Sequence, residues 1–291
     1  ELMHEQSTHA PDMLKAEDWA GEMGANWLAN LTRFESMLAP IGAALLARAD
    51  YQPGQRVLDI GCGGGGTTIA IGKAVAPAGE VLGIDISPDL AAYATRRAAE
   101  AGASNVRFTC TDAASAMLPD APFDRLFSRF GCMFFAEPIP AFTNLRRLLK
   151  PGARIDLGAW ASPHDNPWMS EAMVIVRKYV DLPPPVPRAP GPFAFEDLDY
   201  LRAILAGAGF ASPDVATYEG LQPVGGVGST PDQALDFVMT SMAAGRALVE
   251  QSEAVRSIAG RDLLALFKDR HEDGRGVMMP CKVWLVTAEA R

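Results

Sequence analysis

Short apolar runs alternate with helix-like repeats of apolar residues through the middle of the chain. Five runs have the length of buried strands and lie at residues 56–60, 80–86, 105–110, 123–130 and 153–160. Three segments between them repeat apolar residues at helical spacing, at residues 67–75, 88–101 and 139–149. Strands that alternate with helices predict an α/β protein with a mostly parallel sheet and right-handed crossovers.

The two flanks of this region have a different pattern. Residues 13–49 predict two helices, which we interpret as part of an N-terminal helical lid over residues 1–50. The pattern after Trp160 predicts a helix, a proline-rich connector, a second helix, a strand, a mostly helical segment and a last strand, at residues 167–180, 182–192, 195–208, 214–221, 231–267 and 281–288. Residues 51–291 then form one domain, with helical insertions near 162–192 and 229–276. The last strand is apolar along its length, so we expect it to be buried.

Composition and charge narrow the class of protein. The 291 residues are 48% hydrophobic and 21% charged, which is typical of a globular chain, and 26 basic against 35 acidic residues give a net charge of −9. An acidic chain is a poor binder of a phosphate backbone, so we expect no nucleic-acid partner. No apolar stretch approaches the roughly 20 residues of a membrane span, and no leader pattern opens the chain. We therefore expect no membrane partner and a cytoplasmic location.

The cysteines and histidines indicate no metal centre. The four cysteines, Cys62, Cys110, Cys132 and Cys281, have no zinc-type or redox-pair spacing, so we expect free thiols and no bound metal. The sequence leaves the oligomeric state open.

A glycine-rich loop joins the first predicted strand to the first predicted helix. Four glycines, Gly63 to Gly66, follow Gly61 and Cys62. A plain tight turn does not need so many glycines, whereas a loop that lets its backbone approach a ligand does. Asp59 lies two residues before Gly61, and its carboxylate would repel a pyrophosphate. It suits a ligand with cationic groups, and S-adenosylmethionine has an ammonium and a sulfonium but no phosphate.

This loop resembles motif I of the class I S-adenosylmethionine-dependent methyltransferases, and more closely the ubiquinone/menaquinone-biosynthesis-like small-molecule group. Three further segments agree in order and spacing, at residues 83–87, 111–113 and 145–152. Ala153 stands where the family often has a second glycine, which puts only the shape of that turn in doubt. The resemblance is strong over residues 52–160. It implies a Rossmann-like, doubly wound, mostly parallel seven-stranded sheet with a helical lid and insertions.

The resemblance also implies a cofactor site. Asp85 would hold the ribose hydroxyls, Asp112 the adenine amino group, and the Ala113 N–H an adenine nitrogen. The whole set of expected cofactor-binding residues is Asp59, Gly61, Cys62, Gly63, Gly65, Asp85, Ile86, Asp112, Ala113, Arg129 and Phe130. Each polar member has a structural alternative. Asp85 could be a helix N-terminal charge, Asp112 a turn residue, and Arg129 half of an ion pair. For Cys62, a packing role is favoured over thiol chemistry.

Aromatic residues beyond the loop predict the acceptor side. Phe130 to Phe135 form an apolar wall after the fourth predicted strand, and the expected substrate pocket is lined by Trp27, Phe134, Trp160 and Trp168. Methyl transfer needs mainly proximity and alignment, and a base only where the acceptor must lose a proton. His164, just past the fifth strand, is the best catalytic base candidate. The alternative is an exposed loop histidine.

The sequence therefore predicts an enzyme that transfers a methyl group from S-adenosylmethionine to a small, rather apolar acceptor by in-line displacement, with S-adenosylhomocysteine as product. Two alternatives stay open. One is a non-catalytic module that binds S-adenosylmethionine or S-adenosylhomocysteine, which a filled pocket at residues 130–135 would favour. The other is a nicotinamide oxidoreductase, which Asp59 and the run of glycines disfavour.

Overall fold

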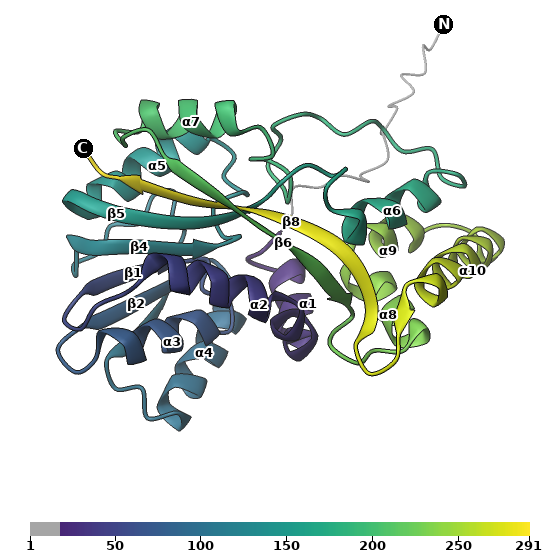
Figure 1. Cartoon of the computed structure of the whole chain (residues 1–291), viewed down its shortest axis with the longest axis horizontal. Coiled ribbons are helices and arrows are strands. Elements are labelled where there is room, and N and C mark those ends of the chain that lie inside the picture. The colour runs from purple at the N-terminus through teal and green to yellow at the C-terminus, as the bar shows by residue number, and fades with distance from the viewer. Residues whose placement is uncertain (1–17) are drawn as a thin grey trace, which may run out of the picture.

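A twisted eight-stranded sheet is the centre of the fold in the computed structural model, which describes residues 18–291 (Figure 1). The strands are β1 (Arg56–Ile60), β2 (Glu80–Asp85), β3 (Val106–Cys110), β4 (Phe123–Arg129), β5 (Leu149–Trp160), β6 (Asp214–Val224), β7 (His271–Glu272) and β8 (Gly276–Glu289). Their order is β3-β2-β1-β4-β5-β8-β6, and the short β7 pairs with β8 off this path. The first five strands are parallel, and β8 runs antiparallel to both β5 and β6. The predicted mostly parallel, seven-stranded sheet is confirmed for the main path, to which β7 adds a short eighth strand.

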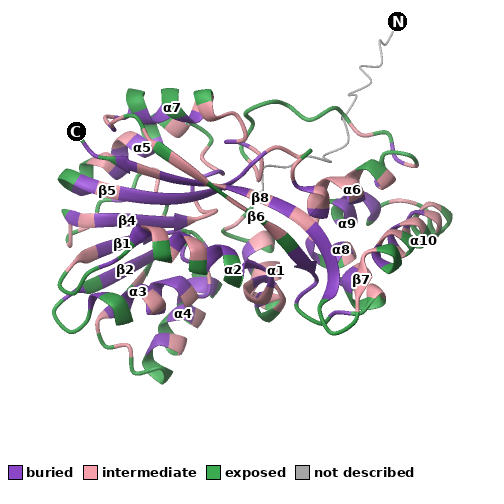
Figure 2. Ribbon diagram, viewed as in Figure 1, coloured by how far each residue is buried: buried purple, intermediate pink, exposed green. Residues whose placement is uncertain are grey.

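Helices cover both faces of this sheet. They are α1 (Glu22–Ala29), α2 (Leu31–Ala49), α3 (Gly66–Val75), α4 (Pro88–Glu100), α5 (Pro138–Arg147), α6 (Pro167–Val176), α7 (Leu198–Gly207), α8 (Pro231–Ser241), α9 (Ala243–Leu248) and α10 (Glu253–Asp269). Helices α2, α3 and α4 lie on one face, and α5 and α7 lie on the other. The central strands are buried along most of their length, as Figure 2 shows. The strand order reverses between β1 and β4. In this architecture ligands bind at such a switch point, at the carboxyl ends of the strands.

The N-terminal segment differs in one respect from the helical prediction. Residues 13–17 lie outside the described part of the chain. Trp19 lies in a turn, and α1 begins only at Glu22. The reason is local, because the Gly21 N–H bonds to both the backbone and the side chain of Asp18, which closes the turn.

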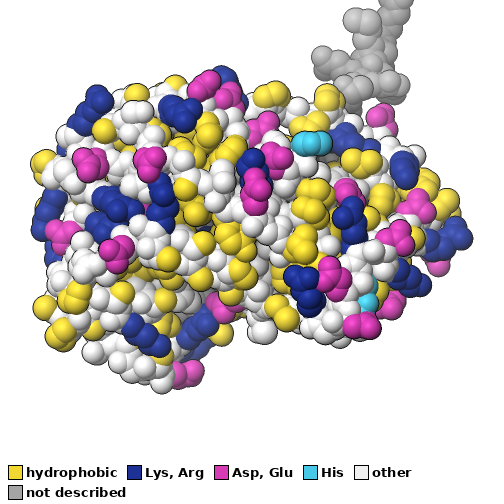
Figure 3. Space-filling view, in the orientation of Figure 1, with side chains coloured by type: hydrophobic (Ala, Val, Ile, Leu, Met, Phe, Trp, Pro, Cys, Tyr) yellow, Lys and Arg dark blue, Asp and Glu magenta, His cyan; other side chains and the backbone are white. Residues whose placement is uncertain are grey.

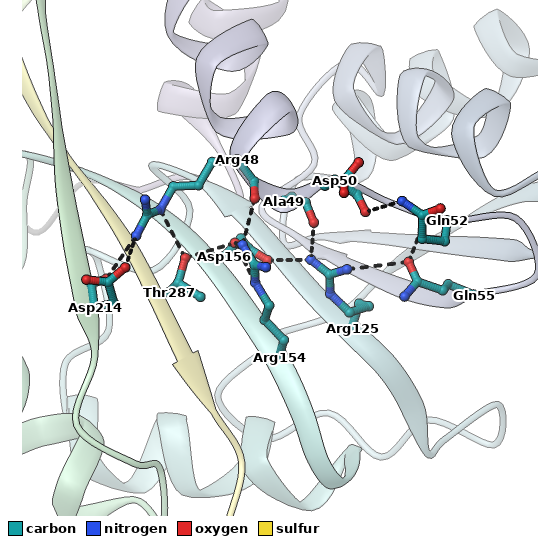
Figure 4. A network of polar contacts seen from close by, with 10 residues as sticks. All are labelled: Arg48, Ala49, Asp50, Gln52, Gln55, Arg125, Arg154, Asp156, Asp214 and Thr287. Carbon is teal, nitrogen blue, oxygen red and sulfur yellow. Dashed lines mark hydrogen bonds and ion pairs between the residues drawn. The ribbon is translucent and has the colours of Figure 1, made fainter.

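The C-terminal end of α2 is held by a buried charge network, drawn in Figure 4. The last carbonyls of a helix lack partners within the helix. Arg125 of β4 donates to the Ala49 carbonyl at 2.6 Å, and Arg154 of β5 donates to the Arg48 carbonyl at 2.7 Å. Asp156, which is 0% exposed, accepts from both guanidinium groups at 2.8 Å. This end of α2 is thereby fixed to the sheet.

The opposite end of α2 lies among the insertions. Strands β6 and β8 form a long ribbon that extends past β5 and supports α8, α9 and α10 (Figure 1). Arg33 of α2 pairs with Asp236 of α8 at 3.0 Å, and the Ser36 hydroxyl accepts from the Val227 N–H. Acidic and basic side chains are interspersed over the face shown in Figure 3. The carboxyl ends of the parallel strands thus lie between α1 with the first half of α2 on one side and the insertion helices on the other.

Candidate active site

The glycine loop has a backbone that other residues would strain. Gly61, Gly63 and Gly65 have φ of +65°, +55° and +82°, in the left-handed region. A Cβ at Gly65 would lie 2.8 Å from the Phe108 ring, and one at Gly61 would lie 2.7 Å from the Cα of Gly131. Alternate glycines therefore set both the path of the loop and its close approach to neighbouring strands.

Asp59 holds the end of this loop through two hydrogen bonds on its buried side. Its Oδ2 accepts from the Thr67 and Thr68 hydroxyls at 2.9 and 2.8 Å, and the residue is 1% exposed. Burial raises the pKa of Asp59 to about 6, against the lowering effect of the two hydroxyls. Asp59 was expected to bind the cofactor. In the structure its carboxylate fixes the start of α3 from the buried side of the loop, and its role toward the cofactor stays a prediction.

Asp85 joins the glycine loop to the next helix. Its Oδ2 accepts from the Gly63 N–H and its Oδ1 from the Ser87 N–H, both at 2.9 Å, and 9% of the residue is exposed. Ser87 in turn caps α4 through the Leu90 N–H. Burial raises the pKa of Asp85, while the backbone N–H groups lower it. The carboxylate is thus oriented by two backbone donors at the carboxyl end of β2.

The expected adenine-side residues lie beside Asp85. Ile86 is 41% exposed, Asp112 is exposed and Ala113 is half-buried. Asp112 Oδ1 accepts from the Ala114 N–H at 2.9 Å, as expected if Asp112 is a turn residue. Its Oδ2 accepts no hydrogen bond from the described residues. Cys62 is buried, and this burial raises the pKa of its thiol well above the ordinary value, which disfavours thiolate chemistry.

Arg129 lies at the end of β4 against α2. Its Nη1 lies 2.8 Å from where a Cβ of Gly42 would be, and its side chain makes no hydrogen bond or ion pair within residues 18–291. Burial lowers the pKa of Arg129, while the charges of Asp59 and Glu35 raise it. The described chain therefore gives no support to the alternative that Arg129 is half of a structural ion pair.

The expected substrate residues fall into two ring clusters. In the first, Trp27 stacks on Phe34 at 3.8 Å, and Trp19 meets both Trp27 and Phe134 edge-on at 5.5 and 5.3 Å. A Cβ at Gly63 would lie 3.7 Å from Trp27 Nε1, so this indole lies over the glycine loop. In the second cluster, Phe130 stacks on Trp160 at 4.2 Å, and Trp168 lies 5.0 Å from Trp160. Phe130 has a φ of +62°, which is unusual for a non-glycine residue.

His164 lies in the turn between β5 and α6 and is exposed. Its assignment as a base stays a prediction. Within the described residues, no group of three or more His, Cys, Asp or Glu side chains has the geometry to hold a metal ion. None of the helices in that part of the chain combines the length and apolar character of a membrane span.

Three features of this site were not predicted. A Cβ at Gly131 would lie 2.4 Å from the Ile60 carbonyl oxygen and 3.0 Å from the Cα of Gly61. The Ser128 hydroxyl donates to that carbonyl and accepts from the Gly131 N–H. Glu35 of α2 pairs with Arg97 of α4, and Arg97 also donates to the Gly64 carbonyl at 3.2 Å. The Phe-Gly sequence directly after β4 could have indicated that the backbone at Gly131 approaches a neighbouring segment closely. Nothing in the sequence pairs two residues 62 positions apart on separate helices.

The sheet order and the glycine loop at the switch point define a Rossmann-like α/β domain that takes a ligand beyond the carboxyl ends of its strands. Residues 57–152 match the model of a family described as a methyltransferase domain. Over these residues the chain therefore carries a methyltransferase domain, and the predicted resemblance to the class I S-adenosylmethionine-dependent methyltransferases is confirmed. The nicotinamide oxidoreductase alternative is not supported.

Relatives cover only part of this chain. It is 32% identical to aklanonic acid methyltransferase of Streptomyces sp. (strain C5), over 43% of this chain and 55% of that protein. It is 30% identical to demethylmenaquinone methyltransferase of Geobacillus sp. (strain WCH70), over 38% and 47%. The chain thus spans about half the length of these relatives. The crystal structure of the YcgJ protein from Bacillus subtilis has a TM-score of 0.58 and 21% identity, and covers 87% of this chain and 99% of its own. That likeness confirms the fold.

Proposed function

We propose that this protein transfers a methyl group from S-adenosylmethionine to a small, rather apolar acceptor by in-line displacement. The observation that carries the proposal is the hydrogen bond by which Asp85 holds the glycine loop. Three left-handed glycines let the backbone approach a ligand, and the carboxylate that fixes Gly63 also lies at the carboxyl end of β2. The relatives that methylate small molecules support the same reaction class.

The residues of the site fit this cofactor. In this proposal, Asp85 binds the ribose hydroxyls, and Ile86, Asp112 and Ala113 bind the adenine. The Arg129 guanidinium, without a bonded partner in the described chain, suits the methionine carboxylate. The buried carboxylates of Asp59 and Asp85 give the loop a negative field, which favours a cationic ligand over a pyrophosphate.

The bound cofactor supplies a methyl carbon activated by its sulfonium, and the chain supplies position and a dry site. The rings of Trp27 and Phe134 exclude water over the loop, and Phe130, Trp160 and Trp168 form an apolar wall for the acceptor. Alignment of this kind contributes about 7–11 kcal/mol in favourable cases. His164 is the proposed base for acceptors that must lose a proton.

The first prediction concerns ligand choice. We expect S-adenosylhomocysteine to raise the melting temperature by several degrees and NAD to leave it unchanged, because the carboxylates of Asp59 and Asp85 would repel a pyrophosphate. Thermal unfolding with each ligand, followed by calorimetric titration, measures both. Binding of NAD without a response to S-adenosylhomocysteine would contradict the proposed function.

The second prediction concerns the N-terminal lid, which we propose comprises residues 1–50. Helix α1 packs on the start of α4, where Gly24 leaves no room for a Cβ beside Ser87, and Trp27 lies over Gly63. The rings occupy the mouth of the loop, so α1 and the start of α2 must move aside to admit a ligand and close upon it, while the end of α2 stays fixed to the sheet. Amide hydrogen exchange over residues 19–34 should therefore slow by at least tenfold when S-adenosylhomocysteine binds. Equal exchange in both states would make α1 a fixed scaffold.

A binding module without catalysis is the second candidate function. Its support is the packing after β4, where Cys132 and Met133 are 4% and 2% exposed and the neighbouring rings are in contact. The two functions differ in one observable. A methyltransferase converts S-adenosylmethionine to S-adenosylhomocysteine when supplied with a panel of small apolar acceptors, whereas a module binds both without turnover.

A further inference from the structure

Two of the four consecutive glycines are not explained by their backbone. Unlike the other two, Gly64 and Gly66 have φ outside the left-handed region, so their conformation is open to residues with a side chain. A Cβ at Gly64 would lie 2.7 and 3.0 Å from the Cδ atoms of Leu31 and 3.4 Å from Glu35 Oε1. A Cβ at Gly66 would lie 3.3 Å from the same oxygen. These two glycines therefore make room for helix α2.

The part of α2 that lies on these glycines is its N-terminal end. Leu31 and Glu35 are four residues apart, so they share one face of the helix. Leu31 is 6% exposed, and Gly64 beneath it is buried. The carbonyls of Arg48 and Ala49, which fix α2 to the sheet, are at the opposite end of the helix. The contact with the glycines is thus made by the part of α2 that must move to admit a ligand.

An ion pair joins this part of α2 to α4 and to the loop. Arg97 of α4 donates to both carboxylate oxygens of Glu35, at 2.5 and 3.0 Å, and its Nη1 also donates to the Gly64 carbonyl at 3.2 Å. The same Nη1 lies 3.5 Å from where a Cβ of Gly66 would be. The side chains of Arg97 and Glu35 are 33% and 30% exposed, so water can replace the pair when α2 moves. One guanidinium therefore holds two helices and the cofactor loop together, through contacts that can be broken.

We propose that Gly64 and Gly66 are the docking site of the N-terminal lid, and that Glu35 and Arg97 are positioning residues that hold the docked lid against the cofactor loop. This rests on the proposed function and adds the contacts by which the closed lid retains the cofactor. The pair acts through the Gly64 peptide and through α2, and a closed lid slows the release of what it covers. The run of glycines then has two roles, since only the other two let the backbone approach a ligand.

The test measures how fast S-adenosylhomocysteine binds to and leaves the immobilised full chain, by surface plasmon resonance. Arg97→Met keeps most of the side-chain length and removes the guanidinium, so it should raise the dissociation rate about fivefold. Gly64→Ala places a Cβ against Leu31 and should raise that rate about tenfold. The association rate should not fall in either variant, because the lid opens before a ligand enters. Leu31→Ala removes both Cδ atoms, so its addition to Gly64→Ala should slow dissociation again.

Arg33→Met is the matched control. Arg33 lies near the same end of α2 and is 35% exposed, but it pairs with Asp236 of α8 at 3.0 Å instead of with α4. Its loss should leave the dissociation rate within about twofold of that of the natural chain. Unchanged dissociation rates in both Arg97→Met and Gly64→Ala would overturn the proposal and make the ion pair merely structural. An equal acceleration in Arg33→Met would also overturn it, because any loosened contact of α2 would then have the same effect.

Amide hydrogen exchange without ligand separates this proposal from the proposed function. Exchange over residues 31–35 should be several-fold faster in Gly64→Ala than in the natural chain, because the added Cβ keeps α2 from docking. A natural chain that binds no S-adenosylhomocysteine would contradict the proposed function. The exchange measurement would then still decide whether the lid docks on Gly64, and equal exchange in the two chains would overturn the docking site.

Discussion

Replacing Asp85 with alanine is expected to lower the affinity for S-adenosylhomocysteine by at least tenfold. A carboxylate that accepts from two ribose hydroxyls makes bonds worth about 1.5–3 kcal/mol each. In this structure the same side chain also orients the Gly63 and Ser87 N–H groups, so its loss loosens the loop as well. Calorimetric titration of the folded variant measures the affinity, and chemical unfolding shows separately how much stability is lost.

Asp89→Ala is the control for this experiment. Asp89 is an exposed carboxylate in the first turn of α4, close in sequence to Asp85, and its charge interacts with the same helix end. Its removal should leave the affinity for S-adenosylhomocysteine within about twofold. Equal losses in the two variants would mean that Asp85 acts only as a helix N-terminal charge, and unchanged affinity in Asp85→Ala would exclude it as the ribose partner.

Asp156→Ala should destabilise the protein by about 3–5 kcal/mol, because it leaves charged Arg125 buried without its counter-ion. Asp156 accepts from Arg125, Arg154 and the Thr287 hydroxyl, and those two arginines also hold the last carbonyls of α2 (Figure 4). Urea unfolding with far-UV circular dichroism measures the change in the free energy of unfolding.

Asp214→Ala tests the same network at its surface. Asp214 pairs with Arg48 at 2.8 Å, but its side chain is 84% exposed. An exposed pair contributes about 0–1 kcal/mol, so this variant should lose no more than that. A comparable loss in both variants would contradict the view that burial makes Asp156 the anchor of α2.

Local patterns in the sequence determined the order of the elements and the position of the cofactor loop. The alternation of apolar runs with helical repeats predicts the parallel strands, because each element must bury its own apolar face. Ser87 with Pro88 predicts the start of α4 for a local reason, a side-chain cap followed by a residue already set for the helix. The same holds for Gly61, Gly63 and Gly65, since a left-handed backbone selects glycine directly.

Only the tertiary structure shows which groups the polar and aromatic side chains contact. Asp59 has the same place in the motif whether it faces a ligand or the hydroxyls of α3, and only packing shows that Thr67 and Thr68 bond to it. Glu35 and Arg97 lie 62 positions apart in the chain and are paired only because α2 and α4 dock beside the same loop. Contacts of this kind depend on strand register and on helix docking over long sequence separations, and no local pattern encodes either of them.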